Sequence, residues 1–219
     1  MVSIRNASRR DVRLALVLAT VNVAIWPIYP VLNHGPNRIF LRTPLDGMIP
    51  LVPIMVIPYL SLIPLLGVAA AVFAIADVRR FQAFALAVTV ALLVSYLIYA
   101  LAQSYVIRPY PGGEGWLTAV VRNVYALDRP YNDFPSLHTS LSVIVAALWR
   151  QAHGRAGLVV VAWCGLIVAS TVLIHQHYLA DVAGGLVVAW LAIAVSDRVI
   201  ERVHHEPQDK RPVRPGGDG

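Results

Sequence analysis

The sequence predicts an all-α integral membrane protein with six transmembrane helices and a long extracytoplasmic loop between the third and the fourth. Of its 219 residues, 58% are hydrophobic and 14% are charged, whereas soluble domains carry about 25% charged residues. The apolar residues occur in runs close to the roughly 20 residues that cross a bilayer. Cys164, the single cysteine, lies within one such run, so an intrachain disulfide and a cysteine-ligated metal are excluded.

Six apolar runs define the expected helices. The first follows an arginine-rich start, and because no Ala-x-Ala-like cleavage site follows it, we expect a retained helix rather than a signal peptide or a twin-arginine export signal. Four prolines early in the second run predict a short interfacial segment before the helix, since proline kinks or breaks helices. The expected spans are residues 14–32, 53–76, 81–106, 138–149 with an extension to 152, 157–174 and 178–200.

Polar segments separate these runs. Residues 33–48 are polar, and residues 77–80 form a tight turn. Residues 107–137 are the longest polar segment, with a short surface helix expected at 117–127, and a loop of that length inside a compact protein is usually functional. Residues 203–219 are rich in proline, glycine and charge, so we expect a disordered cytoplasmic tail after a single six-helix domain at 1–202.

Basic residues are distributed unevenly between the two sides of this arrangement. Thirteen lie on the side that holds both termini and five on the other, so the positive-inside rule predicts a cytoplasmic amino terminus in the plasma (inner) membrane. Topology therefore accounts for the net charge of +6, and we expect no nucleic-acid partner. Nothing in the sequence indicates an oligomeric state. The five extracytoplasmic residues are Arg38, Arg42, Arg108, Arg122 and Arg129.

A histidine and an aspartate lie four residues apart where the fifth predicted helix meets the sixth. On a helix, His177 and Asp181 would share one face within hydrogen-bonding reach. A lone carboxylate in an apolar run costs about 3 kcal/mol or more, so Asp181 needs a partner. A carboxylate on one imidazole nitrogen of His177 leaves the other nitrogen free as a nucleophile or base. The alternative is that the pair only stabilises the start of the helix.

A second polar cluster, Pro135-Ser136-Leu137-His138, opens the fourth predicted helix on the same side of the membrane. Pro135 suits the first turn of a helix, and free N–H groups near Ser136 to His138 would form an anion site, for which phosphate is the usual ligand. Capping by Ser136 is the alternative, but it leaves His138 without a role. Arg108, which follows the third predicted helix, would by itself be an interfacial anchor.

Together these three elements resemble the motifs of the type 2 phosphatidic acid phosphatase superfamily of membrane lipid phosphatases. That family carries Lys, six residues, Arg-Pro; then Pro-Ser-Gly-His; then Ser-Arg, five residues, His, three residues, Asp. The matching residues here are Arg108-Pro109, Pro135-Ser136-Leu137-His138, Ser170-Thr171, His177 and Asp181. The resemblance covers roughly residues 46–190, nearly all of the membrane part.

Three positions depart from the family pattern. Leu101 stands in place of Lys, Leu137 in place of Gly and Thr171 in place of Arg, so two phosphate-binding cations are missing. The resemblance implies that His177 attacks phosphorus, that Asp181 orients it, and that His138 protonates the leaving oxygen. The expected phosphate-binding groups are Arg108, the N–H groups of Ser136 and Leu137, and a replacement cation from His175, Arg122 or Arg129.

The resemblance implies hydrolysis of a phosphomonoester or pyrophosphate of a membrane lipid, without a cofactor, and no carboxylate cluster indicates a divalent metal. Transfer of a phosphorylated head group to an alcohol such as inositol is the alternative. It is favoured by the Phe-Pro-Ser-Leu-His form of the second motif, which resembles relatives of inositol phosphorylceramide synthase. A transporter or proton relay would need polar residues through the depth of several helices, whereas here they gather at one face.

Overall fold

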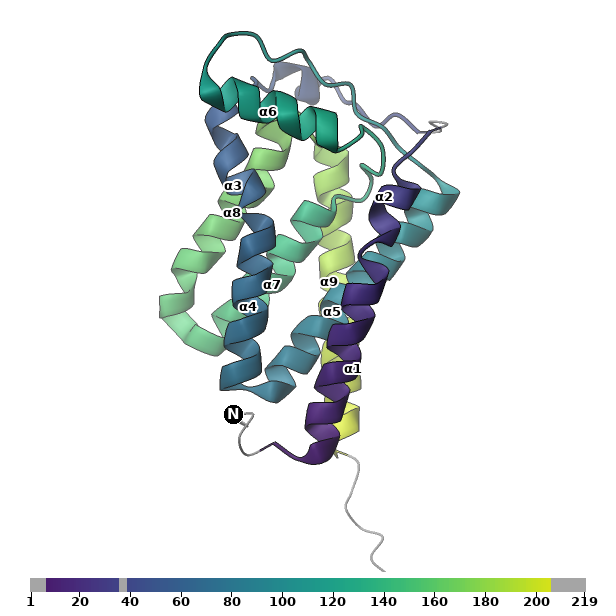
Figure 1. Ribbon diagram of the computed structural model, residues 1–219, viewed down its shortest axis with the longest axis vertical. Helices are drawn as coiled ribbons and strands as arrows, with labels where there is room; N and C mark the ends of the chain where they lie inside the picture. The colour runs from purple at the N-terminus through teal and green to yellow at the C-terminus, as the bar shows by residue number, and fades with distance from the viewer. Residues whose placement is uncertain (1–6, 36–38, 206–219) are drawn as a thin grey trace, which may run out of the picture.

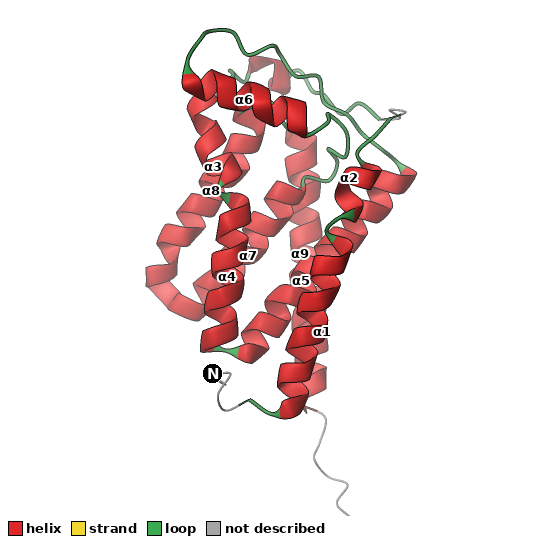
Figure 2. Ribbon diagram, viewed as in Figure 1, coloured by secondary structure: helices red, strands yellow, loops and turns green. Residues whose placement is uncertain are grey.

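The computed structural model describes residues 7–35 and 39–205, and within these ranges the chain is helical and has no β-strand (Figures 1 and 2). The helices of the first half are α1 (Arg9–Ile25), α2 (Ile28–Leu32), η2 (Leu45–Met48), η3 (Pro53–Met55), α3 (Val56–Leu60), α4 (Leu62–Ala76) and α5 (Val78–Leu101). Those of the second half are α6 (Trp116–Leu127), α7 (Leu137–His153), η4 (Gly154–Gly157), α8 (Leu158–Leu173) and α9 (Leu179–His205).

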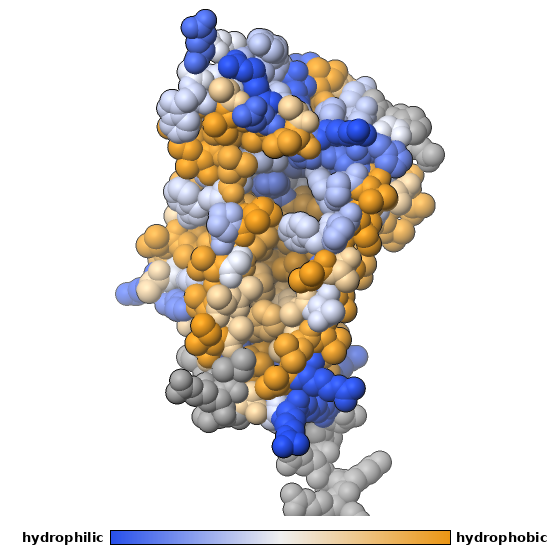
Figure 3. Space-filling model, in the orientation of Figure 1, coloured by the Kyte–Doolittle hydropathy of each residue, from blue (hydrophilic) through white to orange (hydrophobic). Residues whose placement is uncertain are grey.

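Five helical stretches among the described residues are long and apolar enough to cross a membrane: Arg9–Leu32, Pro53–Ala76, Val78–Leu101, Leu137–Leu173 and Leu179–His204. The fourth comprises α7, η4 and α8, and the chain reverses near Gly154, whose φ is 55°. After this reversal α8 packs along α7. Hydrophobic side chains cover the middle of the molecule, and hydrophilic ones gather towards its two ends (Figure 3), as expected of a protein that lies in a membrane.

The centre of the bundle is formed by α5, α7 and α9, which pack against one another. Alanines at this contact are fully buried, including Ala87 and Ala91 of α5 and Ala189 and Ala192 of α9. Small residues let helix backbones approach closely, which is how helices associate where lipid removes the hydrophobic drive between them. The outer helices α1, α4 and α8 then pack against this centre.

Several helix ends differ from those predicted. The predicted first helix breaks at Trp26-Pro27 into α1 and α2, since proline removes a helical N–H donor. The third helix begins at Val78, because the Asp77 carboxylate caps it by accepting from the Arg79 N–H, and it ends at Leu101 rather than at residue 106. Finally, α9 continues to His205 and includes the first three residues of the predicted tail, while 206–219 lie outside the described residues.

The predicted surface helix is confirmed as α6, and it lies across one end of the bundle (Figure 1). That end also carries α2, the segment between α5 and α7, and the starts of α7 and α9. The start of α1, the turn at Asp77 and the end of α9 lie at the opposite end. The two histidine motifs are therefore brought together beneath α6.

Candidate active site

His177 is presented by a tight turn between α8 and α9. The carbonyl of Thr171 accepts the N–H groups of both Gln176 and His177, at 2.9 and 3.1 Å. The chain reverses through His175, which adopts a left-handed φ of 51°, an uncommon conformation for a residue other than glycine. The turn leaves His177 two residues before the first residue of α9, next to the start of α7.

Asp181 has two neighbours at the start of α9. Its Oδ2 accepts the Tyr178 N–H at 2.7 Å, which caps the helix, and lies 3.7 Å from Nδ1 of His177. That separation is too long for a hydrogen bond, and among the described residues His177 Nδ1 and Asp181 Oδ1 are both buried without a hydrogen-bond partner. Asp181 therefore stabilises the helix start and also lies beside the histidine.

The start of α7 is tied directly to the start of α9. Ser136 caps α7, its hydroxyl accepting the Thr139 N–H at 3.3 Å, and its own N–H donates to the Asp181 carbonyl at 3.0 Å. The predicted role of the Ser136 N–H in an anion site is therefore corrected, because that donor is occupied. Pro135 precedes the cap instead of lying in the first turn. The N–H groups of Leu137 and His138 have no acceptor within the helix, as at any helix start.

His138 lies one residue into α7 and faces His177. Its ring stacks on Tyr59 of α3, with centroids 4.1 Å apart and planes 11° apart, and its centroid lies 6.4 Å from that of His177. Tyr59 was not singled out from the sequence as a site residue, although it lies in the proline-rich segment that precedes α4. The stacking fixes the orientation of the His138 ring.

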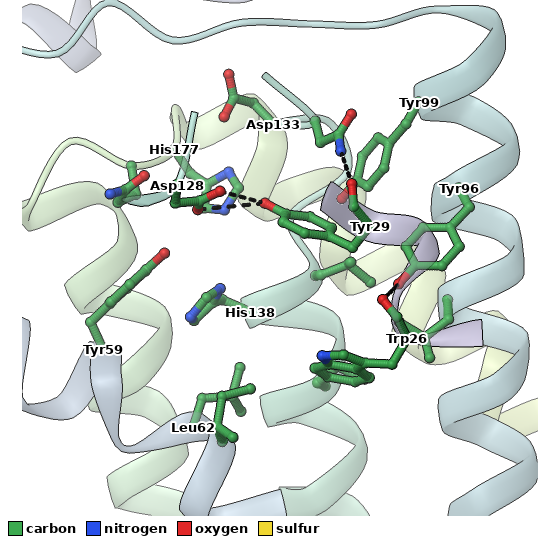
Figure 4. Close-up of a pocket in the computed structure, with 16 residues that line it drawn as sticks. Trp26, Tyr29, Tyr59, Leu62, Tyr96, Tyr99, Asp128, Asp133, His138 and His177 are labelled. Carbon is green, nitrogen blue, oxygen red and sulfur yellow. Dashed lines mark hydrogen bonds between the residues drawn. The ribbon is translucent and has the colours of Figure 1, made fainter. Parts of the chain in front are cut away.

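Both histidines line a cavity of about 190 Å³ beneath α6 (Figure 4). Tyrosines from three helices contribute to its wall, and its floor is apolar. Two carboxylates, Asp128 and Asp133, also line it, and neither was predicted as a site residue. The remaining lining residues are Trp26, Tyr29, Tyr59, Leu62, Ile63, Leu92, Tyr96, Tyr99, Asn132, Leu137, Leu141 and Gln176.

The cavity carboxylates come from the segment between α6 and α7. Asp128 accepts hydrogen bonds from the Tyr29 hydroxyl at 3.1 Å and from Asn33 at 2.7 Å. Burial raises its pKa, although the nearby Arg108 opposes this shift. Burial, together with the negative charge of Asp181, raises the pKa of Asp133 well above the ordinary value. The sequence did not indicate that Asp128 and Asp133 line the cavity, because they lie in a loop, where spacing along the chain does not relate a residue to either histidine.

Arg108 does not line the cavity itself, but it contacts Gln176, which does. Its guanidinium donates to the Asp128 carbonyl at 2.5 Å and to the side-chain oxygen of Gln176, which lines the cavity. It also lies over the Tyr125 ring, 5.1 Å from the centroid. Its Nε is buried and has no hydrogen-bond partner in the described part of the chain. Arg108 thus places positive charge behind Gln176, the residue that precedes His177.

A sequence model of the PAP2 superfamily matches residues 38–195. The chain belongs to the PAP2 superfamily. The match spans all three motifs and confirms the resemblance to the type 2 phosphatidic acid phosphatase superfamily. No match was found among curated proteins or among solved structures. PAP2 proteins are phosphatases or phosphotransferases, so membership indicates an activity of that type in a membrane protein.

The positions that depart from the PAP2 motifs add no cation to the cavity. Leu101 is 66% exposed and does not line it. Thr171 is fully buried, and its hydroxyl donates to the Val168 carbonyl within α8. Leu137 contributes an apolar part of the wall.

The three predicted replacement cations also lie outside the lining of the cavity. Arg122 donates to the carbonyls of Pro111 and Gly113 at 3.0 and 2.9 Å and so braces the loop before α6. His175 lies towards Ile49, and burial lowers its pKa. Arg129 is exposed. Over the ranges 7–35 and 39–205, no group of three or more His, Cys, Asp or Glu side chains could hold a metal ion.

Proposed function

We propose that this PAP2 protein is a metal-independent lipid phosphatase that acts through a phosphohistidine at His177. The observation that supports this proposal is the pair of imidazoles from the start of α7 and from the turn before α9. They face one cavity with centroids 6.4 Å apart, and a carboxylate lies beside one of them. A phosphoryl group between the two rings would be within reach of both, since reacting atoms lie about 3–3.5 Å apart before reaction.

In the first step Nε2 of His177 attacks phosphorus, and the bond from phosphorus to the leaving oxygen breaks. His138 donates a proton to that oxygen. Asp181 holds Nδ1–H of His177 and stabilises the positive charge that develops, once the 3.7 Å gap has shortened to a hydrogen bond. Catalytic hydrogen bonds are often long before substrate binds. In the second step His138 takes a proton from water, the water oxygen attacks phosphorus, and His177 is released.

The phosphate oxygens would be held at the start of α7 and by the charge of Arg108. The Leu137 and His138 N–H groups, at the positive end of the helix dipole, are suitable donors. Arg108 would act through Gln176, to whose side-chain oxygen it already donates. Donors fixed before the reaction stabilise charge that develops in the transition state.

We further propose six membrane crossings with the cavity on the extracytoplasmic side. The 37-residue stretch Leu137–Leu173 would cross twice, because α7 and α8 pack antiparallel about the reversal at Gly154. The ends of the bundle would then carry the thirteen and five basic residues counted above, which favours a cytoplasmic amino terminus.

Transfer to an alcohol is the second candidate, and the acidic lining of the cavity favours it. Asp128 and Asp133 offer carboxylate oxygens to hydroxyl groups, and an acceptor alcohol held there would lie in the same cavity as His177. The resemblance to inositol phosphorylceramide synthase relatives is consistent with this reaction. Both reactions use one covalent intermediate, and only the final acceptor differs.

The test is to incubate purified protein with a panel of lipid phosphates, with and without inositol or other alcohols, and to identify the products. Release of inorganic phosphate that added alcohol does not divert supports hydrolysis. Formation of a phosphorylated alcohol supports transfer. Products that are equally abundant with His177→Ala would contradict both reactions at this site.

A further inference from the structure

A second, larger cavity lies beside the active-site cavity in the membrane-spanning part of the molecule. It has a volume of about 490 Å³ and is lined by residues of α1, α4 and α5, with Trp26 and Pro27 beyond the end of α1. The helices α1 and α4 both pack against α5 but make little contact with each other, so a groove remains between them. Figure 3 shows this face of the molecule with hydrophobic side chains along it.

The groove is suited to an apolar occupant. Its wall carries Val23 of α1, Leu66 and Ala70 of α4, and Phe84 and Val88 of α5. Asn22 supplies the one amide side chain of the lining. Its nitrogen already donates to Leu18, Ala85 and Thr89, and its oxygen is buried from the groove. A polar or charged ligand would lose its hydration there without compensation.

The groove and the active-site cavity share part of their walls. Trp26 and Ile63 line both, and Figure 4 shows Trp26 at the edge of the active-site cavity. Trp26 is placed there by the end of α1, because the helix stops before Pro27 and resumes as α2. One molecule can therefore lie in both spaces, with its polar end at the histidines and its apolar part against α1 and α4.

We infer that the groove between α1, α4 and α5 binds the hydrocarbon chain of the lipid phosphate whose phosphate group reaches His177. This inference rests on the proposed phosphatase function and adds the site of the chain to it. The lining residues of α4 run from Ile63 to Ala70, which is about 10 Å at 1.5 Å per residue. The groove would thus hold the part of the chain nearest the phosphate, and the rest would remain among the lipids of the bilayer.

Gly67 of α4 offers a direct way to fill the groove. It lines the groove, and a Cβ added there meets no atom within 4 Å, so the side chain of Gly67→Leu starts from open space in the groove. Gly165 of α8 is the matched control, because a Cβ added there also meets nothing within 4 Å and it lines neither cavity. Both glycines lie inside helices and are exposed.

The experiment compares kcat/KM for long-chain phosphatidic acid and for short-chain phosphatidic acid whose acyl chains end before they reach Gly67, about 6 Å along α4 from Ile63. It uses mixed micelles and full-length wild type, Gly67→Leu and Gly165→Leu. We expect Gly67→Leu to lower the ratio of long-chain to short-chain kcat/KM by about tenfold, which corresponds to the lost burial of roughly two methylene groups. Gly165→Leu should leave that ratio as in wild type. An unchanged ratio in Gly67→Leu, or equal falls in both variants, would overturn the inference while leaving the phosphatase function intact.

A second measurement does not depend on turnover. Phosphatidic acid with a photoreactive group on its chain is cross-linked to wild type and to Gly67→Leu, and the labelled peptides are identified. Labelling of α1, α4 and α5 that Gly67→Leu abolishes supports the inference. If such labelling occurs but no phosphate is released, only the phosphatase function is rejected. Labelling confined to other helices, or labelling of α1, α4 and α5 that Gly67→Leu leaves unchanged, would overturn the inference.

Discussion

At the scale of single residues, the two cavity histidines should fail in different ways when they are replaced. His177→Ala removes the proposed nucleophile, whereas His138→Ala removes only the proton donor, and a general acid contributes about 100- to 10,000-fold. A nitrophenyl phosphate needs little protonation of its leaving group. We therefore expect this substrate to restore much of the activity of His138→Ala and none of that of His177→Ala, measured as initial rates on lipid and nitrophenyl substrates.

The control for that comparison is Asp181→Asn. It keeps the nucleophile but removes the charge beside it, so its rates should fall between those of the two alanine variants on both substrates. Equal restoration of His138→Ala and His177→Ala by the nitrophenyl substrate would contradict the assigned roles.

Asp133 should make the protein less stable as the pH rises. Burial and the neighbouring Asp181 raise its pKa, and one of its oxygens is buried without a hydrogen-bond partner in the described structure. A raised folded-state pKa contributes stability that is complete below the unfolded value of about 4 and is lost as the pH rises through the folded value. Asp133→Asn should therefore raise the melting temperature more at pH 8 than at pH 4, measured in detergent. A larger rise at pH 4 would contradict this account.

The sequence alone predicted His177, Asp181 and His138 as candidate site residues, from the four-residue spacing of the first two and from the resemblance to the family motifs. The structure places both histidines on one cavity. The sequence did not locate the groups that would hold phosphate. Arg122 braces a loop, and the N–H of Ser136 is bound to the Asp181 carbonyl. These outcomes depend on contacts between residues far apart in sequence, and residue type and side of the membrane do not determine them.

At the scale of helices, the close contact between α7 and α9 sets the distance between the two histidines. A Cβ at Gly185 of α9 would lie 2.6 Å from the Ser136 carbonyl oxygen and 2.7 Å from Thr139 Cβ, so Gly185→Ala must push the helix starts apart. Such overpacking costs about 1–3 kcal/mol. We expect a lower melting temperature together with a loss of kcat on lipid and nitrophenyl substrates alike.

The comparison variant for this contact is Gly165→Ala, at a position where a Cβ meets no atom within 4 Å. It should melt at or above the temperature of wild type, because alanine is the better helix former. A Gly185→Ala protein with wild-type kcat would show that the α7–α9 separation does not control the reaction.

Helix ends were predictable only where local chemistry sets them. Gly154 marked the turn between α7 and α8, and α6 began within one residue of its predicted start. The end of α5 at Leu101 was not predicted, because residues 102–106 contain no glycine, proline or charged residue that would end a helix. The chain instead leaves the helix there and pairs with distant segments, at Ser104 with Ile39 and at Tyr105 with Tyr131.

At the scale of the whole molecule, the six proposed crossings would place residues 114 and 155 on opposite sides of the membrane. Both Glu114 and Arg155 are exposed, and the single natural cysteine, Cys164, is buried. In a Cys164→Ala background, Glu114→Cys should react with a membrane-impermeant thiol reagent in intact cells, and Arg155→Cys should react only after lysis. The reverse pattern would place the active site in the cytoplasm.

The sequence predicted that the protein lies in a membrane, because its apolar runs are long enough to cross one. It also predicted that the motifs gather at one end of the molecule, because each lies at the extracytoplasmic end predicted for the helix that it flanks. It did not predict which helices touch. The packing of α1 and α4 on α5, and with it the groove beside the active site, depends on side-chain shape along whole helices. The stacking of Tyr59 on His138 was not predicted either, because it depends on how α3 packs.

The most direct test of the central claim is to trap the covalent intermediate. Wild-type protein is mixed with lipid carrying a labelled phosphate, in excess chelator, and quenched with alkali during turnover, and labelled peptides are then sequenced. We predict label that is stable to alkali and labile to acid on the peptide that contains His177, and no such label on His177→Ala. Turnover without this label, label that persists on His177→Ala, or activity that is lost in chelator and restored by magnesium would contradict the account.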